Sequence, residues 1–195
     1  TYDVALELGA CGHVFAEGHR IRLAVSPTYW PNAWPSPSAA TLEILTGQRS
    51  RLELPLLGET GPTPSLEPAE ASPPLPDSDP RVERDREIVV DAETGRHEIR
   101  DHQVDGRTIA GTGVRYTEEW GDTYTIVERD PLSATVRCER ETRSESSGHP
   151  WRVAVSAEMA CDSDDFLVTE AYSAHEGEHE VYARTREYRI PRDHV

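Results

Sequence analysis

The sequence predicts an all-β fold, and three observations support this prediction. Apolar and polar residues alternate along several short runs, no stretch of a dozen residues shows helical periodicity, and one Pro-rich stretch separates the β-like runs into two groups. Successive side chains of a strand point to opposite faces of a sheet, so alternating runs indicate half-buried antiparallel strands. We therefore expect an antiparallel β-sandwich.

The clearest alternation lies in three runs of seven to nine residues. Residues 2–8, "YDVALEL", and residues 20–26, "RIRLAVS", place apolar side chains at every second position. Residues 151–159, "WRVAVSAEM", do the same in the second half of the chain. Shorter repeats of the pattern occur at Tyr124 and Ile126 and at Ala134, Val136 and Cys138. Each of these segments is expected to form a strand.

A Pro-rich stretch from Gly58 to Pro80 interrupts these runs, with seven prolines in 23 residues. Proline cannot donate to a strand ladder and it fixes an extended backbone. The stretch is therefore expected to be a linker or a surface strap, and the chain divides into a β segment at 1–57, the linker at 58–80 and an antiparallel β region at 81–195.

The charge of the chain is strongly negative and unevenly distributed. The net charge of the 195 residues is -16, and residues 1–57 hold five acidic residues against four Arg. Nearly all of the excess negative charge therefore lies after residue 57, where it would repel phosphate backbones and anionic lipids. Nucleic acid and membrane surfaces are not expected as partners, and no apolar run approaches the roughly 20 residues that span a bilayer.

Three cysteines, Cys11, Cys138 and Cys161, are odd in number, far apart and in no C-x-x-C spacing. This arrangement disfavours a disulfide framework and a Cys-rich zinc site, and it favours a reducing compartment. We expect a cytoplasmic protein without a metal or another cofactor.

One stretch does satisfy a metal motif. Residues 175–179, "HEGEH", match H-E-x-x-H, which binds zinc in peptidases when a helix places both histidines on one face. Here strand-like runs flank the motif on both sides, and Gly177 at its centre disfavours a helix by about 1 kcal/mol. A hairpin loop between two strands is the better interpretation.

Other catalytic motifs are missing or incomplete. No G-x-S-x-G nucleophile elbow occurs in the sequence, so we assign no catalytic residue. Asp162, Asp164 and Asp165 lie close together, but this stretch lacks the Gly and the distal Glu of a calcium loop. It is interpreted as a polar turn between strands.

The most distinctive composition lies in residues 26–37, "SPTYWPNAWPSP", where Tyr29, Trp30 and Trp34 stand among four prolines. Large aromatic side chains usually bury against something, so the favoured interpretation is a rigid loop that plugs a neighbouring domain or covers a β core. The alternative is a platform on which these three aromatics face a carbohydrate or another substrate.

Residues 15–37, "FAEGHRIRLAVSPTYWPNAWPSP", resemble the C-terminal jelly-roll region of X-Pro dipeptidyl-peptidases and cocaine-esterase-like hydrolases. In that family the pattern F-x-x-G-H-R-[IL]-R-L-x-[IV]-S is a recurrent marker, and the continuation Y-W-P-x-x-W-P-S-P is typical of one bacterial branch. "DPLSA" at residues 130–134 and "IPRD" at residues 190–193 resemble the tail of the same branch.

The resemblance implies a partial galactose-binding-like jelly roll with an additional antiparallel sheet beside it. It also implies that an α/β-hydrolase domain with a Ser-His-Asp triad precedes this region in the same protein and is its partner; further copies of the chain are candidate partners in a homo-oligomer. Because the resemblance begins near the last strands of the jelly roll, Ile21, Leu23 and Val25 would lack part of their facing sheet.

These points predict a non-catalytic C-terminal β region of a serine hydrolase that cleaves acyl esters or X-Pro peptides. Its own role would be docking between domains and shaping of the active-site cleft. Two alternatives remain open at this level: an autonomous carbohydrate-binding β-sandwich that uses Trp30 and Trp34, and a zinc hydrolase that uses residues 175–179.

Overall fold

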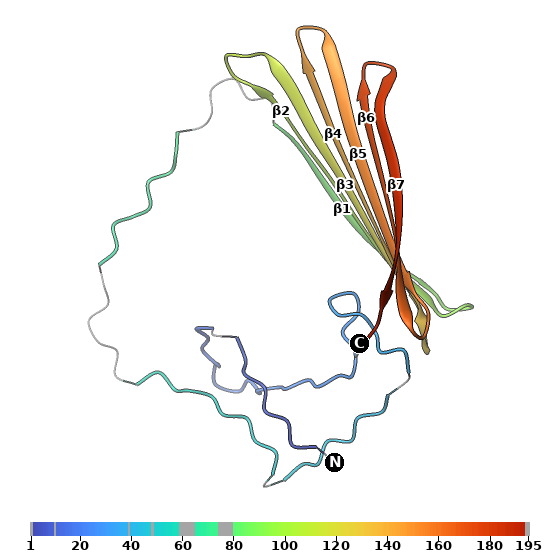
Figure 1. Cartoon of the computed structure of the whole chain (residues 1–195). Coiled ribbons are helices and arrows are strands. Elements are labelled where there is room, and N and C mark those ends of the chain that lie inside the picture. Colours follow the sequence, from blue (N-terminus) through green and yellow to red (C-terminus); the bar gives the residue numbers. More distant parts are fainter. Residues whose placement is uncertain are drawn as a thin grey trace.

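The computed structural model describes residues 2–9, 11–38, 40–47, 49–58, 65–73 and 80–193. Within these ranges every element of regular secondary structure is a β-strand, which confirms the prediction of an all-β chain. The same ranges contain no helix that could cross a membrane. Figure 1 shows the strands side by side in one layer, with the earlier part of the chain running outside that layer.

Seven strands follow one another between Arg81 and Pro191, and most are long. Their bounds are β1 Arg81–Asp91, β2 Arg96–Ile109, β3 Val114–Val127, β4 Asp130–Ser146, β5 His149–Cys161, β6 Asp165–Glu176 and β7 His179–Pro191. The predicted strands around Tyr124, around Val136 and at residues 151–159 are confirmed, since they lie in β3, β4 and β5.

The strands form a single antiparallel meander in the order β1-β2-β3-β4-β5-β6-β7. Each strand pairs with the next through a short hairpin connection, which accounts for the fan of hairpins in Figure 1. The β4–β5 turn contains Ser147 and Gly148 at φ values of 52° and 79°. Positive φ at both central residues is the geometry of a two-residue type I′ turn, whose twist matches that of the strands it joins.

The register gives the sheet two chemically different faces, because residues that pair across antiparallel strands share a face. One row across the sheet is apolar or aromatic and defines what we call the apolar face: Ile88, Ile99, Tyr124, Val136, Met159, Val168 and Tyr188. The adjacent row points the other way and defines the charged face: Glu87, Arg100, Thr123, Arg137, Glu158, Thr169 and Glu187.

The expected β-sandwich is not formed by the part of the chain that the structure describes, which holds a single sheet. The predicted strands at residues 2–8 and 20–26 were wrong for this chain, since neither run pairs with another to form a strand. Their apolar side chains are exposed, Val25 by 50% and Ile21 by 54%. A strand needs a neighbour for its N–H and C=O groups, and an isolated Tyr29–Ala33 bridge is the only pairing described before β1.

The division of the chain at residues 57 and 80 stays a prediction. The first strand begins at Arg81, directly after the Pro-rich stretch. Residues 59–64 and 74–79 of that stretch lie outside the described residues. Its described residues, 58, 65–73 and 80, lie in neither a helix nor a strand.

Candidate functional site

Residues 29–37, which we call the aromatic loop, contact one end of the sheet. The rings of Trp30 and Trp34 meet edge to face with centroids 4.8 Å apart. Trp30 also contacts Tyr124 of β3 at 6.5 Å, and Trp34 contacts Phe166 of β6 at 5.5 Å, again edge to face. This is a favoured geometry for aromatic pairs. The loop therefore packs against the apolar face, to which Tyr124 belongs.

The indole of Trp34 is also held by a hydrogen bond. Its Nε1 donates to the Sγ atom of Cys161, 3.2 Å away at the end of β5. Cys161 is buried, and its thiol in turn lies 3.9 Å from the carbonyl oxygen of Leu132. A Trp N–H that leaves water needs an acceptor, and Cys161 supplies it at this position.

Arg192 joins the aromatic loop to the C-terminal end of β7. This side chain is only 4% exposed; its Nη2 donates to the carbonyl oxygen of Pro35, and its Nη1 donates to that of Asp162 at 3.2 Å. The guanidinium carbon also lies 4.9 Å from the ring centroid of Phe166. A planar guanidinium can donate in several directions while it stacks on an aromatic ring, which a lysine cannot do.

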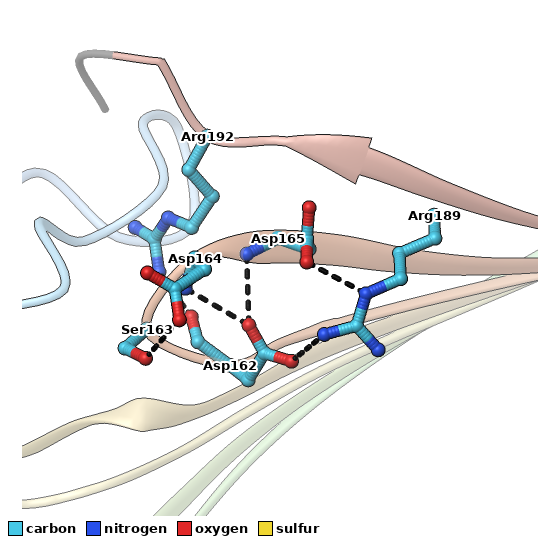
Figure 2. A network of polar contacts seen from close by, with 6 residues as sticks. All are labelled: Asp162, Ser163, Asp164, Asp165, Arg189 and Arg192. Carbon is cyan, nitrogen blue, oxygen red and sulfur yellow. Dashed lines mark hydrogen bonds and ion pairs between the residues drawn. The ribbon is translucent and has the colours of Figure 1, made fainter.

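The β5–β6 turn beside this arginine is a compact polar network, shown in Figure 2. Oδ1 of Asp162 accepts hydrogen bonds from the backbone N–H groups of Asp164 and Asp165, at 2.9 and 2.8 Å. Arg189 of β7 donates to the carboxylates of Asp162 and Asp165, both at 2.6 Å. These backbone bonds, helped by the charge of Arg189, lower the pKa of Asp162. The prediction of a polar turn between strands is confirmed.

Three segments that are far apart in sequence meet at this end of the sheet, which we call the junction. They are the aromatic loop, the start of β4 at residues 130–134, where Ala134 is fully buried, and residues 190–193 with Arg192. These are the segments that carry the family resemblance. Sequence reasoning did not predict that the aromatic loop contacts Arg192 directly and reaches Leu132 through Cys161. Cys161, Phe166 and Arg192 were not selected as site residues from the sequence.

The three aromatics selected from the sequence occupy different environments. Trp30 and Trp34 are half-buried in the junction, with ring planes at 88° to each other rather than side by side in one plane. Tyr29 is 70% exposed and makes a backbone bridge to Ala33. Their role as substrate-facing or interface-facing residues stays a prediction.

The H-E-x-x-H stretch forms the β6–β7 hairpin, as predicted, with Gly177 in the turn at a φ of 60°. His179 pairs with Glu176, whereas His175 pairs with Glu180, so the two imidazoles start from opposite faces of the sheet. His175 instead lies beside Arg152, whose Nη2 is 3.2 Å from its Nδ1. Across the described ranges, no cluster of three or more His, Cys, Asp or Glu side chains could hold a metal ion.

A shallow hollow on the charged face is lined by side chains of alternating sign and by small residues. Glu141 lies between Arg143 and Arg152, and Nε2 of His102 is 3.0 Å from Oε1 of Glu119. Each acid in this group already has a basic neighbour. The hollow is therefore lined by side chains that already pair with one another, and its chemistry does not single out a ligand.

Comparison with known proteins identifies the first third of the chain. Residues 1–64 match the family model of the X-Pro dipeptidyl-peptidase C-terminal non-catalytic domain. This match agrees with the resemblance of residues 15–37, and it contains the whole aromatic loop. All seven strands lie beyond it. No curated protein and no solved structure matches the chain.

Proposed function

We propose, from the premise that residues 1–64 belong to the family of X-Pro dipeptidyl-peptidase C-terminal non-catalytic domains, that the chain is an accessory region of a serine hydrolase. The α/β-hydrolase domain of the same protein would cleave an acyl ester or an X-Pro peptide through an acyl-enzyme. The region described here would dock onto the rest of that protein and shape one side of its active-site cleft.

One observation carries this proposal: residues 20–26 have the alternation of a half-buried strand but no neighbouring strand in the described chain. Ile21, Leu23 and Val25 are each at least 50% exposed. Burying apolar surface is worth about 25 cal/mol per Å², and pairing would also satisfy the backbone groups of this run. Pairing with a sheet from another part of the parent protein would therefore stabilise residues 20–26 as a strand.

The junction supports the docking role because it keeps residues 20–26 close to the sheet. Val25 lies five residues before Trp30, a span of at most about 18 Å. Trp30, Trp34 and Pro35 are anchored on β3, β5, β6 and the end of β7. A domain that pairs with residues 20–26 would thus have the sheet as a close neighbour, and such a neighbour can form one wall of a cleft.

A comparison of three proteins tests the proposal: the isolated chain, the full parent, and the parent truncated before the sheet. We expect no turnover of p-nitrophenyl esters or X-Pro amides by the isolated chain and measurable turnover by the parent. Truncation should raise KM for a bulky substrate more than for a small one, because the lost region shapes the cleft and not the bond-breaking step. Robust hydrolysis by the isolated chain would overturn the proposal.

A further inference from the structure

Most of the apolar face is uncovered beyond the junction. Its exposed apolar side chains include Trp151 and Val153 of β5, at 43% and 40%, and Tyr182 of β7 at 49%. Seven strands at a spacing of about 4.8 Å, each about 12 residues long at about 3.3 Å per residue, give this face an area of about 1,100 Å². A stable protein interface buries about 800 Å² on each partner, so the face is large enough for one.

Two polar clusters on this face are hydrogen-bonded within themselves. Arg140 donates from Nη1 and Nη2 to the two carboxylate oxygens of Asp122, at 2.7 and 2.9 Å. The Glu170 carboxylate accepts hydrogen bonds from the hydroxyls of Tyr172 and Tyr188. An ion pair of this kind leaves water at a smaller cost than two isolated charges, so Asp122 and Arg140 can be buried together more readily than either side chain alone.

The junction indicates which partner covers the face. Trp30 and Trp34 already occupy one end of it, and Val25, near the end of the 20–26 run, is tethered within about 18 Å of Trp30. We propose that the apolar face is a docking surface for the β module in which residues 20–26 are a strand, so that this module and the sheet form two packed layers. The inference rests on the proposed function, because the other strands of that module come from the parent protein.

Two packed sheets lie about 10 Å apart, which the tether easily spans. The packing would restore the sandwich that the alternation in residues 2–8 and 20–26 predicts, with the two layers drawn from different parts of the protein. A second copy of this chain is the competing occupant. It would meet the same apolar side chains, but nothing tethers it to the junction.

A matched pair of cysteine variants in the full parent tests this inference. Val153→Cys lies on the apolar face and Leu167→Cys on the charged face, and the two native side chains are 40% and 37% exposed. Both variants are made with Cys11→Ser, since Cys11 is exposed. Maleimide labelling of folded protein should be at least about tenfold slower at position 153 than at position 167, at every protein concentration.

Equal labelling rates would overturn the inference, and so would protection at position 153 that disappears on dilution, because that result identifies a second copy.

Trp151→p-benzoylphenylalanine in the parent gives a second measurement. It should cross-link to a peptide of the same polypeptide upstream of β1, and a cross-linked dimer would contradict the proposal. Hydrolysis is assayed on the same proteins, so that the two proposals can be separated. If position 153 is protected but the parent hydrolyses no substrate, only the proposed function is rejected. If the parent is active but positions 153 and 167 are labelled at equal rates, only this inference is rejected.

Discussion

Residues 2–58 and residues 81–191 have similar sequence patterns but different structures. Both contain runs in which apolar and polar residues alternate, yet among the residues that the structure describes only the second region forms strands. In the second region a tight turn connects each run to a run of similar length, so each strand can pair with the next one along the chain. In the first region the runs are separated by aromatic, proline and glycine residues. Alternation therefore predicts the ability to form a strand, and a neighbour decides whether the strand forms.

Arg192 connects the two regions, so its substitution measures how strongly the aromatic loop is held to the sheet. Arg192→Ala removes hydrogen bonds to the carbonyls of Pro35 and Asp162 and the contact with Phe166. Because the side chain is buried, we expect the free energy of unfolding to fall by about 2–3 kcal/mol, measured by urea denaturation. The matched control is Arg189→Ala. Arg189 is 61% exposed and its ion pairs should contribute less than about 1 kcal/mol. Equal losses in the two variants would show that Arg192 does not clamp the loop.

A second variant acts on the loop side of the same contact. Trp34→Ala removes the ring that packs on Phe166 and the N–H that donates to Cys161. We expect a loss of about 2 kcal/mol for this half-buried ring, and Trp34→Phe should recover part of it by restoring the ring contact without the hydrogen bond. Tyr29→Ala should change stability by less than about 0.5 kcal/mol, since Tyr29 is 70% exposed. A larger effect at Tyr29 than at Trp34 would contradict the described docking.

Within the sheet, the H-E-x-x-H hairpin can be tested through its glycine. Gly177→Ala should destabilise the protein by about 1 kcal/mol, because Gly177 has a φ of 60° that a residue with a Cβ adopts at a cost. Gly121→Ala is the control, since Gly121 has no positive φ and an added Cβ would meet only ordinary contacts. Thermal unfolding monitored by circular dichroism measures both. A helix-borne zinc site would instead tolerate Ala at position 177 and would gain stability from added zinc.

The smallest expected effect is a pH dependence at the polar centre of the apolar face. Burial, together with the hydrogen bond and the charge of Asp122, raises the pKa of the Cys138 thiol from 9.0 to about 11. A raised pKa means that the fold prefers the neutral thiol. The stabilisation is therefore complete below pH 9 and is lost as the pH rises through about 11. Alkylation of Cys138 in folded protein should follow the same rise, and Asp122→Asn should move it to lower pH. An alkylation midpoint near 9 in both proteins would contradict this assignment.

Much of the second region could be predicted from the sequence. The strands around Tyr124, Val136 and residues 151–159, the turn at Asp162–Asp165 and the hairpin at Gly177 all follow from local patterns that operate over a few residues. The single layer was not predicted, because alternation says which side chains share a face but not what covers that face.

The junction shows why the rest could not be predicted. Arg192 reaches the carbonyl of Pro35 across 157 positions, and Trp34 donates to Cys161 across 127 positions. No local signal pairs such residues, since a lone Arg near the end of a chain and a lone Cys at a strand end are common. The aromatic loop was recognised by its composition, but its partners depend on the folded sheet.

Hydrogen–deuterium exchange of residues 20–26 tests the central claim most directly, because that claim is that this run is a strand whose neighbours belong to another part of the parent protein. In the isolated chain its amides should exchange at nearly the rate of an unstructured peptide. In the full parent the same amides should exchange at least about a hundredfold more slowly, while the strands of the sheet are protected in both. Unchanged exchange of residues 20–26 in the parent would contradict the account.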